Sequence, residues 1–213
     1  MKIYFISGLG ADERIFQKLE IPSEYEVVHL SWIVPLKGEK VEAYVKRLSA
    51  QINSSEPFVL IGLSFGGMLV SELLKFLKPE RAIVISSFKS EWLPWYFRFA
   101  RFTRLYKILP YSLFKMGNRF IYWLMGMKTK EEKILLKQIL KDSDKRFIKW
   151  AVHTLLHWQN KEPDDFIFHI HGNNDKLVPL KYVKPDAVVN KGGHLMVYTH
   201  AWEVSSIIAD GLR

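Results

Sequence analysis

Residues 57–66 read PFVLIGLSFG, and this stretch decides the fold. Its first seven residues are uncharged and rich in aliphatic side chains, which predicts a buried strand. Residues 65–77 follow with a helical pattern that stops before a proline. Ser64 therefore lies where a strand turns directly into a helix, and Gly62 and Gly66 leave room for a tight, strained turn. Taken alone, the pattern also fits an ordinary strand-to-helix turn.

The alternation of strand and helix continues on both sides of this stretch. Apolar runs predict five further strands, and helical spacing or capping predicts three further helices. The predicted strands are residues 3–7, 26–32, 82–86, 166–170 and 187–189, and the predicted helices are residues 12–19, 39–52 and 200–210. Strands that alternate with helices form a parallel sheet with helices on both faces. The sequence therefore predicts an α/β fold.

Two further polar residues follow predicted strands. Asp175 lies in the segment HGNNDKLVP, which starts at His171 after the fifth strand, and His194 follows a glycine pair after the sixth. Because parallel strands end at one edge of the sheet, both side chains are expected near Ser64 at that edge. Alone, Asp175 also fits a turn former and His194 a structural histidine.

Together, these motifs resemble those of the α/β-hydrolases. The order Ser64, Asp175, His194 is the chain order of that superfamily, and GLSFGG, HGNNDKLVP and GGH are typical of it. The resemblance covers about residues 1–87 and 161–213. It implies a mostly parallel six-stranded sheet in the order 2-1-3-4-5-6, without the N-terminal hairpin of larger members. It also implies Ser64 as nucleophile, His194 as base and Asp175 as the group that orients the base.

The resemblance further implies an oxyanion hole at the turn after the first strand. The backbone N–H groups of Leu9 and Phe65 are expected to hold the oxyanion. Ser7 stands where the family often has histidine, but the donors are backbone groups, so the hole is expected to survive this difference.

Residues 88–160 interrupt the alternation with helical patterns alone, which predicts a helical lid between the fourth and fifth strands. Pro94 at a helix start opens a stripe of aromatic and aliphatic residues that runs to Leu109, and Thr129 begins a capping box. We expect the stripe to line an apolar substrate pocket, although such rings also serve to attach a lid to the core. The predicted substrate-binding residues are Trp95, Phe99, Phe102 and Tyr106.

The charge of the 213-residue chain is concentrated in this insertion. Residues 89–150 contain 15 Lys/Arg and 5 Asp/Glu, whereas the rest of the chain contains 16 and 17. The excess fits an anionic lipid surface, coenzyme A or an acidic carrier protein, and it equally fits a solvated surface. No nucleic-acid motif accompanies it. The chain has no cysteine, and we expect a cytoplasmic protein that needs no metal or organic cofactor.

These observations predict a serine hydrolase that cleaves small-molecule carboxylic esters or thioesters with an apolar acyl chain, through an acyl-enzyme on Ser64. A lysophospholipase-like esterase and a carrier-protein acyl esterase both fit. Two other classes stay open. One is a non-catalytic, ligand-binding protein of the same fold, and the other is a peripheral membrane protein that uses residues 95–109.

Overall fold

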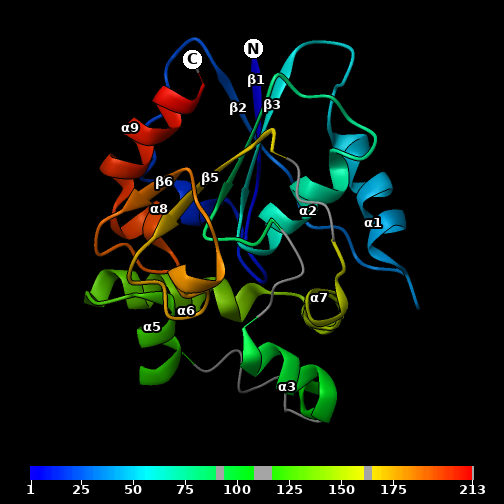
Figure 1. The fold of residues 1–213 in the computed structure, drawn as a ribbon, viewed down its shortest axis with the longest axis vertical. Coiled ribbons are helices and arrows are strands. Elements are labelled where there is room, and N and C mark those ends of the chain that lie inside the picture. Colours follow the sequence, from blue (N-terminus) through cyan, green and yellow to red (C-terminus); the bar gives the residue numbers. More distant parts are fainter. Residues whose placement is uncertain (90–93, 108–116, 161–164, 213) are drawn as a thin grey trace.

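The computed structural model describes residues 1–89, 94–107, 117–160 and 165–212, and it contains one six-stranded sheet between helices (Figure 1). All neighbouring strands are parallel, in the order β2-β1-β3-β4-β5-β6. The predicted fold class and strand order are therefore confirmed. The strands are β1 (Lys2–Ile6), β2 (Glu26–His29), β3 (Phe58–Leu63), β4 (Arg81–Ile85), β5 (Ile167–Gly172) and β6 (Ala187–Val189).

Helices cover the two faces of the sheet with separate hydrophobic clusters. Side chains alternate along each strand, so Tyr4 and Ile6 of β1 join one cluster, and Ile3 and Phe5 join the other. The first cluster includes α1 (Val41–Leu48) and α2 (Phe65–Leu73), and the second includes α9 (Ala201–Gly211), α8 (Met196–Thr199) and the 3₁₀ turn η1 (Glu13–Phe16). Both α1 and α2 are shorter than predicted, since each gives way to a 3₁₀ segment or turns.

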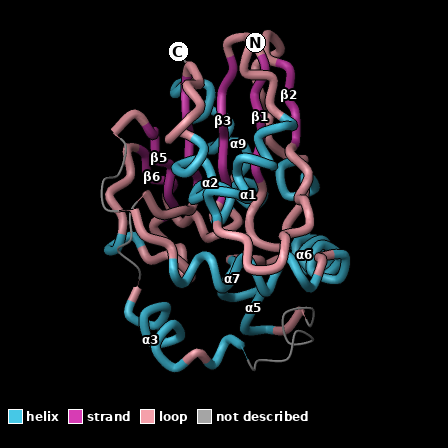
Figure 2. The backbone as a smooth tube through the Cα atoms, turned by 90° about the vertical axis from the view of Figure 1, so that its right-hand side faces the viewer, coloured by secondary structure: helices cyan, strands magenta, loops and turns pink. Residues whose placement is uncertain are grey.

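In the described residues between β4 and β5, the regular elements are all helices or 3₁₀ turns. These helices lie beyond the carboxyl ends of the strands (Figures 1 and 2). They are α3 (Trp95–Thr103), α5 (Arg119–Met125), α6 (Lys130–Asp142) and α7 (Lys145–His157), with the 3₁₀ turn η3 (Leu105–Lys107) after α3. In the described part of the chain, no helix combines the length and apolar character needed to cross a bilayer.

Two of these helices share the clusters of the sheet. Ile139 of α6 belongs to the cluster that contains Ile3, and Phe147 and Ala151 of α7 belong to the cluster that contains Tyr4. The division of the chain at residues 88 and 160 stays a prediction, but α6 and α7 pack as part of the core.

Side-chain caps set the starts of α6 and α7. The Thr129 hydroxyl accepts the N–H of Glu132 at 3.2 Å, and the Glu132 carboxylate accepts the N–H of Thr129 at 2.8 Å. This is the predicted capping box, and it is confirmed. Asp144 caps α7 by accepting the N–H groups of Arg146 and Phe147. Ser143 and Asp144 thus form a sharp corner between two long helices.

Helix α3 is shorter than the predicted stripe, and three rings of the stripe are exposed. It ends at Thr103 because Arg104 adopts a left-handed conformation, with φ of 55°. Trp95, Phe99 and Phe102 of the aromatic stripe are all exposed, so these rings do not attach the helix to the core. Neighbouring aromatic residues pack inward instead. Leu109, the end of the predicted stripe, lies outside the described residues.

Tyr96 and Phe97 attach α3 to the rest of the protein. The Tyr96 hydroxyl donates to the backbone oxygen of Leu177 at 2.6 Å, and the Phe97 ring meets Phe88 edge-on at 6.1 Å. Phe97 also packs against the first core cluster. The helix therefore has aromatic residues on both sides, and packing, rather than periodicity, selects the inward side.

A buried carboxylate joins the end of the insertion to α2. The Glu72 side chain is 1% exposed and lies 2.7 Å from Lys75 Nζ. It also accepts the indole N–H of Trp158 at 2.7 Å. A buried carboxylate is stable only when it is paired and hydrogen-bonded, so both contacts are needed.

Replacing the indole should therefore weaken the fold. We expect Trp158→Phe to lower the free energy of unfolding by about 1–3 kcal/mol, because the buried Glu72 carboxylate loses a donor. Urea denaturation measures this difference. The matched control is Trp202→Phe, since Trp202 is 81% exposed. Equal stability of the two variants would show that the Trp158–Glu72 contact does not stabilise the fold.

Candidate active site

Ser64 occupies a strained turn between β3 and α2. Its φ of 53° and ψ of −116° lie outside the regions that L-residues favour. Hydrogen bonds from β4 and the loop after it hold this conformation: the Ser64 N–H donates to Ile85 O at 2.8 Å, and the Ser87 hydroxyl donates to Ser64 O at 2.6 Å. The turn raises the Ser64 side chain at the carboxyl edge of the sheet, as the sequence predicts.

Glycines make this turn sterically possible. A Cβ atom at Gly66 would lie 2.2 Å from Ile6 O, and one at Gly62 would lie 2.5 Å from Gly66 O. Both are backbone contacts that cannot move aside without displacing β1 or α2. The two glycines of the motif are therefore required by the close approach of β1, β3 and α2.

Three side chains form a continuous hydrogen-bonded chain. His194 Nε2 lies 2.8 Å from Ser64 Oγ, and His194 Nδ1 lies 2.8 Å from Asp175 Oδ2. His194 and Asp175 are 2% and 4% exposed, whereas Ser64 is half-buried. Since the carboxylate can only accept at Nδ1, Nε2 is left to accept the Ser64 proton. The structure thus brings together the three residues that the sequence singles out.

The Asp175 carboxylate is held by its own loop. Oδ1 accepts the backbone N–H groups of Leu177 and Val178 at 2.9 and 2.8 Å, which leaves Oδ2 directed at His194. The loops after β5 and β6 also touch, because a Cβ at Gly172 would lie 2.2 Å from Gly192 O. This contact fixes the separation of the Asp175 and His194 loops.

Two buried histidines extend this chain beneath Asp175. His171 Nε2 lies 2.8 Å from the Val178 carbonyl, so it is the N–H donor, and His171 Nδ1 then accepts from His169 Nε2 at 3.1 Å. His171 Nε2 also lies 3.6 Å from Asp175 Oδ2. Burial lowers the pKa of His169 to about 3, and burial lowers the pKa of His171 as well. Both histidines therefore act as neutral supports of the Asp175 loop, His171 directly and His169 through His171.

The turn after β1 lies beside Ser64 and is tightly held. A Cβ at Gly8 would lie 3.4 Å from Ser64 Cβ, so the turn borders Ser64. The Ser7 hydroxyl donates to Ala11 O at 2.8 Å. Among the described residues, no hydrogen bond uses the backbone N–H of Leu9 or Phe65. Both groups are therefore available for the oxyanion role, which stays a prediction.

The insertion contacts each of the three loops around Ser64. From the α6–α7 corner, the Ser143 hydroxyl donates to Gly10 O at 2.6 Å in the turn after β1. At the end of α5, Met125 O accepts the N–H of Leu195, next to His194, at 3.1 Å. Tyr96 of α3 reaches the Asp175 loop, as described above. Sequence motifs carry no sign of these contacts, since they join polar groups that are distant in the chain.

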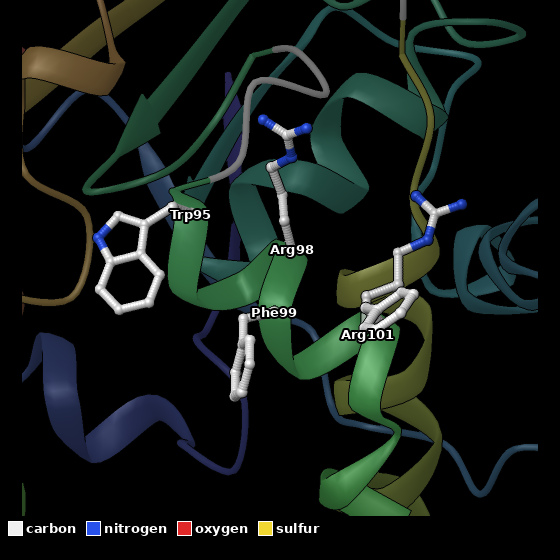
Figure 3. Close-up of a pocket in the computed structure, with 5 residues that line it drawn as sticks. Trp95, Arg98, Phe99 and Arg101 are labelled. Carbon is white, nitrogen blue, oxygen red and sulfur yellow. The ribbon is translucent and has the colours of Figure 1, made fainter.

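The predicted substrate-binding residues do not gather at the triad. Trp95, Phe99 and Phe102 line a hollow of about 620 Å³ together with two arginines of the same helix (Figure 3). Tyr106 packs elsewhere, with its hydroxyl 2.7 Å from Nδ1 of His153 on α7. Their role in binding substrate stays a prediction.

The described residues contain no group of three or more His, Asp or Glu side chains that could hold a metal ion. The rings of His153 and His157 lie 4.2 Å apart at a tilt of 34°, and the Nδ1–H of His157 is donated to the His153 carbonyl.

Comparison with known proteins places the fold. No family model matches the sequence, and no curated protein matches it. Solved structures do match over nearly the whole chain. An esterase from Exiguobacterium antarcticum has a TM-score of 0.80 at 13% identity, over 99% of this chain and 91% of its own. A thermophilic esterase from Thermogutta terrifontis has a TM-score of 0.75 at 15% identity, over 100% and 89%.

MenH from S. aureus is similar in the same way, with a TM-score of 0.71 at 15% identity, over 100% of this chain and 93% of its own. The neighbours are esterases, bromoperoxidases and MenH, which share one architecture. The chain has the α/β-hydrolase fold, as its motifs predict.

The buried histidines predict a loss of stability in acid. In the unfolded chain a histidine takes up a proton near pH 6.5, whereas folded His169 resists protonation down to about pH 3. The contribution of such a histidine to the free energy of unfolding is therefore fully present above about pH 6.5. It decreases as the pH drops below that value, by up to about 1.4 kcal/mol per pH unit for each such histidine. We expect His169→Gln to reduce the slope of the unfolding free energy against pH between about pH 4 and 6. An unchanged slope in urea denaturation would contradict this assignment.

Proposed function

We propose that this protein is a serine hydrolase that cleaves carboxylic esters or thioesters. The observation that carries the proposal is the hydrogen-bonded chain Ser64–His194–Asp175, with 2.8 Å at both links. These distances suit proton transfer from the hydroxyl to the imidazole. The neighbours that bear the name esterase support ester hydrolysis as the general activity.

The mechanism follows from the roles that the contacts allow. His194 Nε2 takes the Ser64 proton as Ser64 Oγ attacks the carbonyl carbon, and Asp175 stabilises the imidazolium through Nδ1–H. The backbone N–H groups of Leu9 and Phe65 donate to the oxyanion. The tetrahedral intermediate collapses and expels the alcohol or thiol, which receives the proton from His194. Water then attacks the acyl-enzyme with His194 again as base, and this step releases the acid and restores Ser64.

The acyl group that fits best is apolar. Phe65, next to the nucleophile, packs against Trp32, Phe147 and Trp150 at centroid distances of 5.9–6.1 Å, so the surroundings of the turn are rich in aromatic rings. Water is poorly accommodated by such surfaces, and an acyl chain is well accommodated. A lysophospholipase-like esterase and an esterase of acidic acyl carrier proteins both agree with this chemistry and with the basic insertion. A purely ligand-binding protein is disfavoured because it has no use for a complete triad.

The nucleophile is tested by one substitution. Ser64→Ala should abolish labelling by a fluorophosphonate and lower kcat on p-nitrophenyl esters by about 10⁴–10⁶, because no other group can form the acyl-enzyme. Ser71→Ala is a matched control, since Ser71 is a buried serine of α2, the helix that follows Ser64, and its hydroxyl has no partner among the described residues. Retained labelling in the Ser64 variant would remove Ser64 from the mechanism.

The acyl preference is tested with p-nitrophenyl esters of increasing chain length. We expect kcat/KM to rise with each methylene up to a medium chain, by at most about fourfold per group, the equivalent of ~0.8 kcal/mol. If Trp95 and Phe99 bind the acyl chain, the double variant Trp95→Ala/Phe99→Ala should flatten this rise and leave acetate hydrolysis unchanged. Trp202→Ala is the control. A profile unaltered by the double variant would remove both residues from the acyl site.

A further inference from the structure

The exposed aromatic residues of this protein are concentrated on two helices. Of the eight exposed Phe and Trp side chains in the described residues, five lie on α3 and α5, and each of these is at least 55% exposed. They are Trp95, Phe99 and Phe102 on α3, and Phe120 and Trp123 on α5. Single exposed aromatic residues are common, but five on two short helices are an unusual concentration of exposed apolar surface. We call these two helices the aromatic tip.

The aromatic tip projects from one end of the molecule. Helices α3 and α5 lie at the end opposite the N-terminus in both views (Figures 1 and 2). On α5, the rings of Phe120 and Trp123 stack at 5.9 Å. On α3, Tyr96 and Phe97 already attach the helix to the core, so its exposed rings are not needed for that purpose. The exposed rings of α3 are therefore not required to hold this helix on the protein.

Positive charge is mixed with these rings. Arg98 and Arg101 line the same hollow as Trp95, Phe99 and Phe102, and they extend from the same helix as Trp95 and Phe99 (Figure 3). Arg104, Lys107 and Arg119 are also exposed. Among the described residues, no carboxylate forms an ion pair with Arg98 or Arg101. Residues 92–130 contain eight Lys/Arg and no Asp/Glu.

We propose that the aromatic tip docks on an anionic phospholipid bilayer. Tryptophan and phenylalanine side chains insert at the boundary of head groups and acyl chains, while arginines bind lipid phosphates above it. An acidic protein would be recognised by the charge, but it offers no apolar phase for five protruding rings. A neutral apolar partner would leave the arginines unpaired. A bilayer with anionic lipids satisfies both features at once.

Docking in this orientation turns the carboxyl edge of the sheet toward the bilayer, since the insertion lies beyond that edge (Figure 1). Ser64 stands at the same edge. The lipid phase would then supply an amphiphilic ester to the site, and this part of the inference rests on the proposed function. The docking itself does not depend on catalysis.

The test uses the full chain as the Ser64→Ala variant, so that no lipid is hydrolysed during binding. Flotation with vesicles of phosphatidylcholine alone is compared with flotation with mixed phosphatidylcholine and phosphatidylglycerol. We expect clear binding only to the mixed vesicles. Binding should weaken as NaCl is raised from about 0.1 M to about 1 M, because the Debye length falls from about 10 Å to about 3 Å.

Two double variants separate the contributions of charge and rings. Arg98→Glu/Arg101→Glu should lower partition more than tenfold, since each basic residue near an anionic surface contributes about fivefold. Phe99→Ser/Phe102→Ser should lower it by a similar factor while the salt dependence stays. The matched controls are Lys37→Glu/Lys46→Glu, exposed lysines around α1, and Trp202→Ser, an exposed ring on α9. All of these residues are exposed, and the urea midpoint checks that each variant folds.

The inference is overturned if the parent binds no anionic vesicle, or if the controls lose as much partition as the tip variants. A second result would also overturn it: an acyl carrier protein binds the Ser64→Ala parent, the Arg98→Glu/Arg101→Glu variant loses this binding, and neither protein binds vesicles. The aromatic tip would then be a binding site for an acidic protein. Vesicle binding by the Ser64→Ala variant together with a wild type that hydrolyses no ester would leave docking intact and would contradict only the proposed function.

Discussion

The strained backbone at Ser64 is the constraint on which the rest of the site depends. A serine at φ 53° is unfavourable by itself, and it persists because the surrounding structure determines it from several sides. The backbones of β1 and α2 close around it so tightly that Gly62 and Gly66 cannot carry a Cβ. Hydrogen bonds to Ile85 and from Ser87 then fix its two peptide groups. The core of the sheet thus holds the side chain at the edge where the other loops meet.

The insertion is best understood as part of this framework. It donates to the turn after β1 through Ser143, accepts from the His194 loop through Met125, and reaches the Asp175 loop through Tyr96. Helices α6 and α7 contribute to both hydrophobic clusters, so these contacts are anchored in the core. A change in the insertion that displaces one of these contacts would alter the geometry of the Ser64–His194–Asp175 hydrogen bonds without replacing any of the three residues.

Polar and apolar groups are placed in opposite ways in two parts of the protein. Beneath Asp175, two neutral histidines satisfy each other and the Val178 carbonyl, so a polar chain is buried without net charge. On the aromatic tip, apolar rings are exposed beside arginines that have no carboxylate partner among the described residues. The first arrangement stabilises the interior at neutral pH. In the second arrangement, the rings and arginines can form favourable contacts only with a partner that has both apolar and anionic parts.

The α/β fold class could be predicted from the sequence, and so could the meeting of Ser64, Asp175 and His194 at one edge of the sheet, while the strand order was implied by the resemblance to α/β-hydrolases. The meeting could be predicted because βα units with parallel strands place every strand end at one edge, so motifs that follow strands must meet there. Tertiary structure alone decided the rest. Helix α3 carries aromatic residues on both sides, so periodicity could not select the side with Phe97 for the core. Its end at Arg104 depends on a left-handed residue that is not glycine. The partners of Ser143 and Tyr96 are 133 and 81 residues away, and only the packed chain brings such groups within hydrogen-bonding distance.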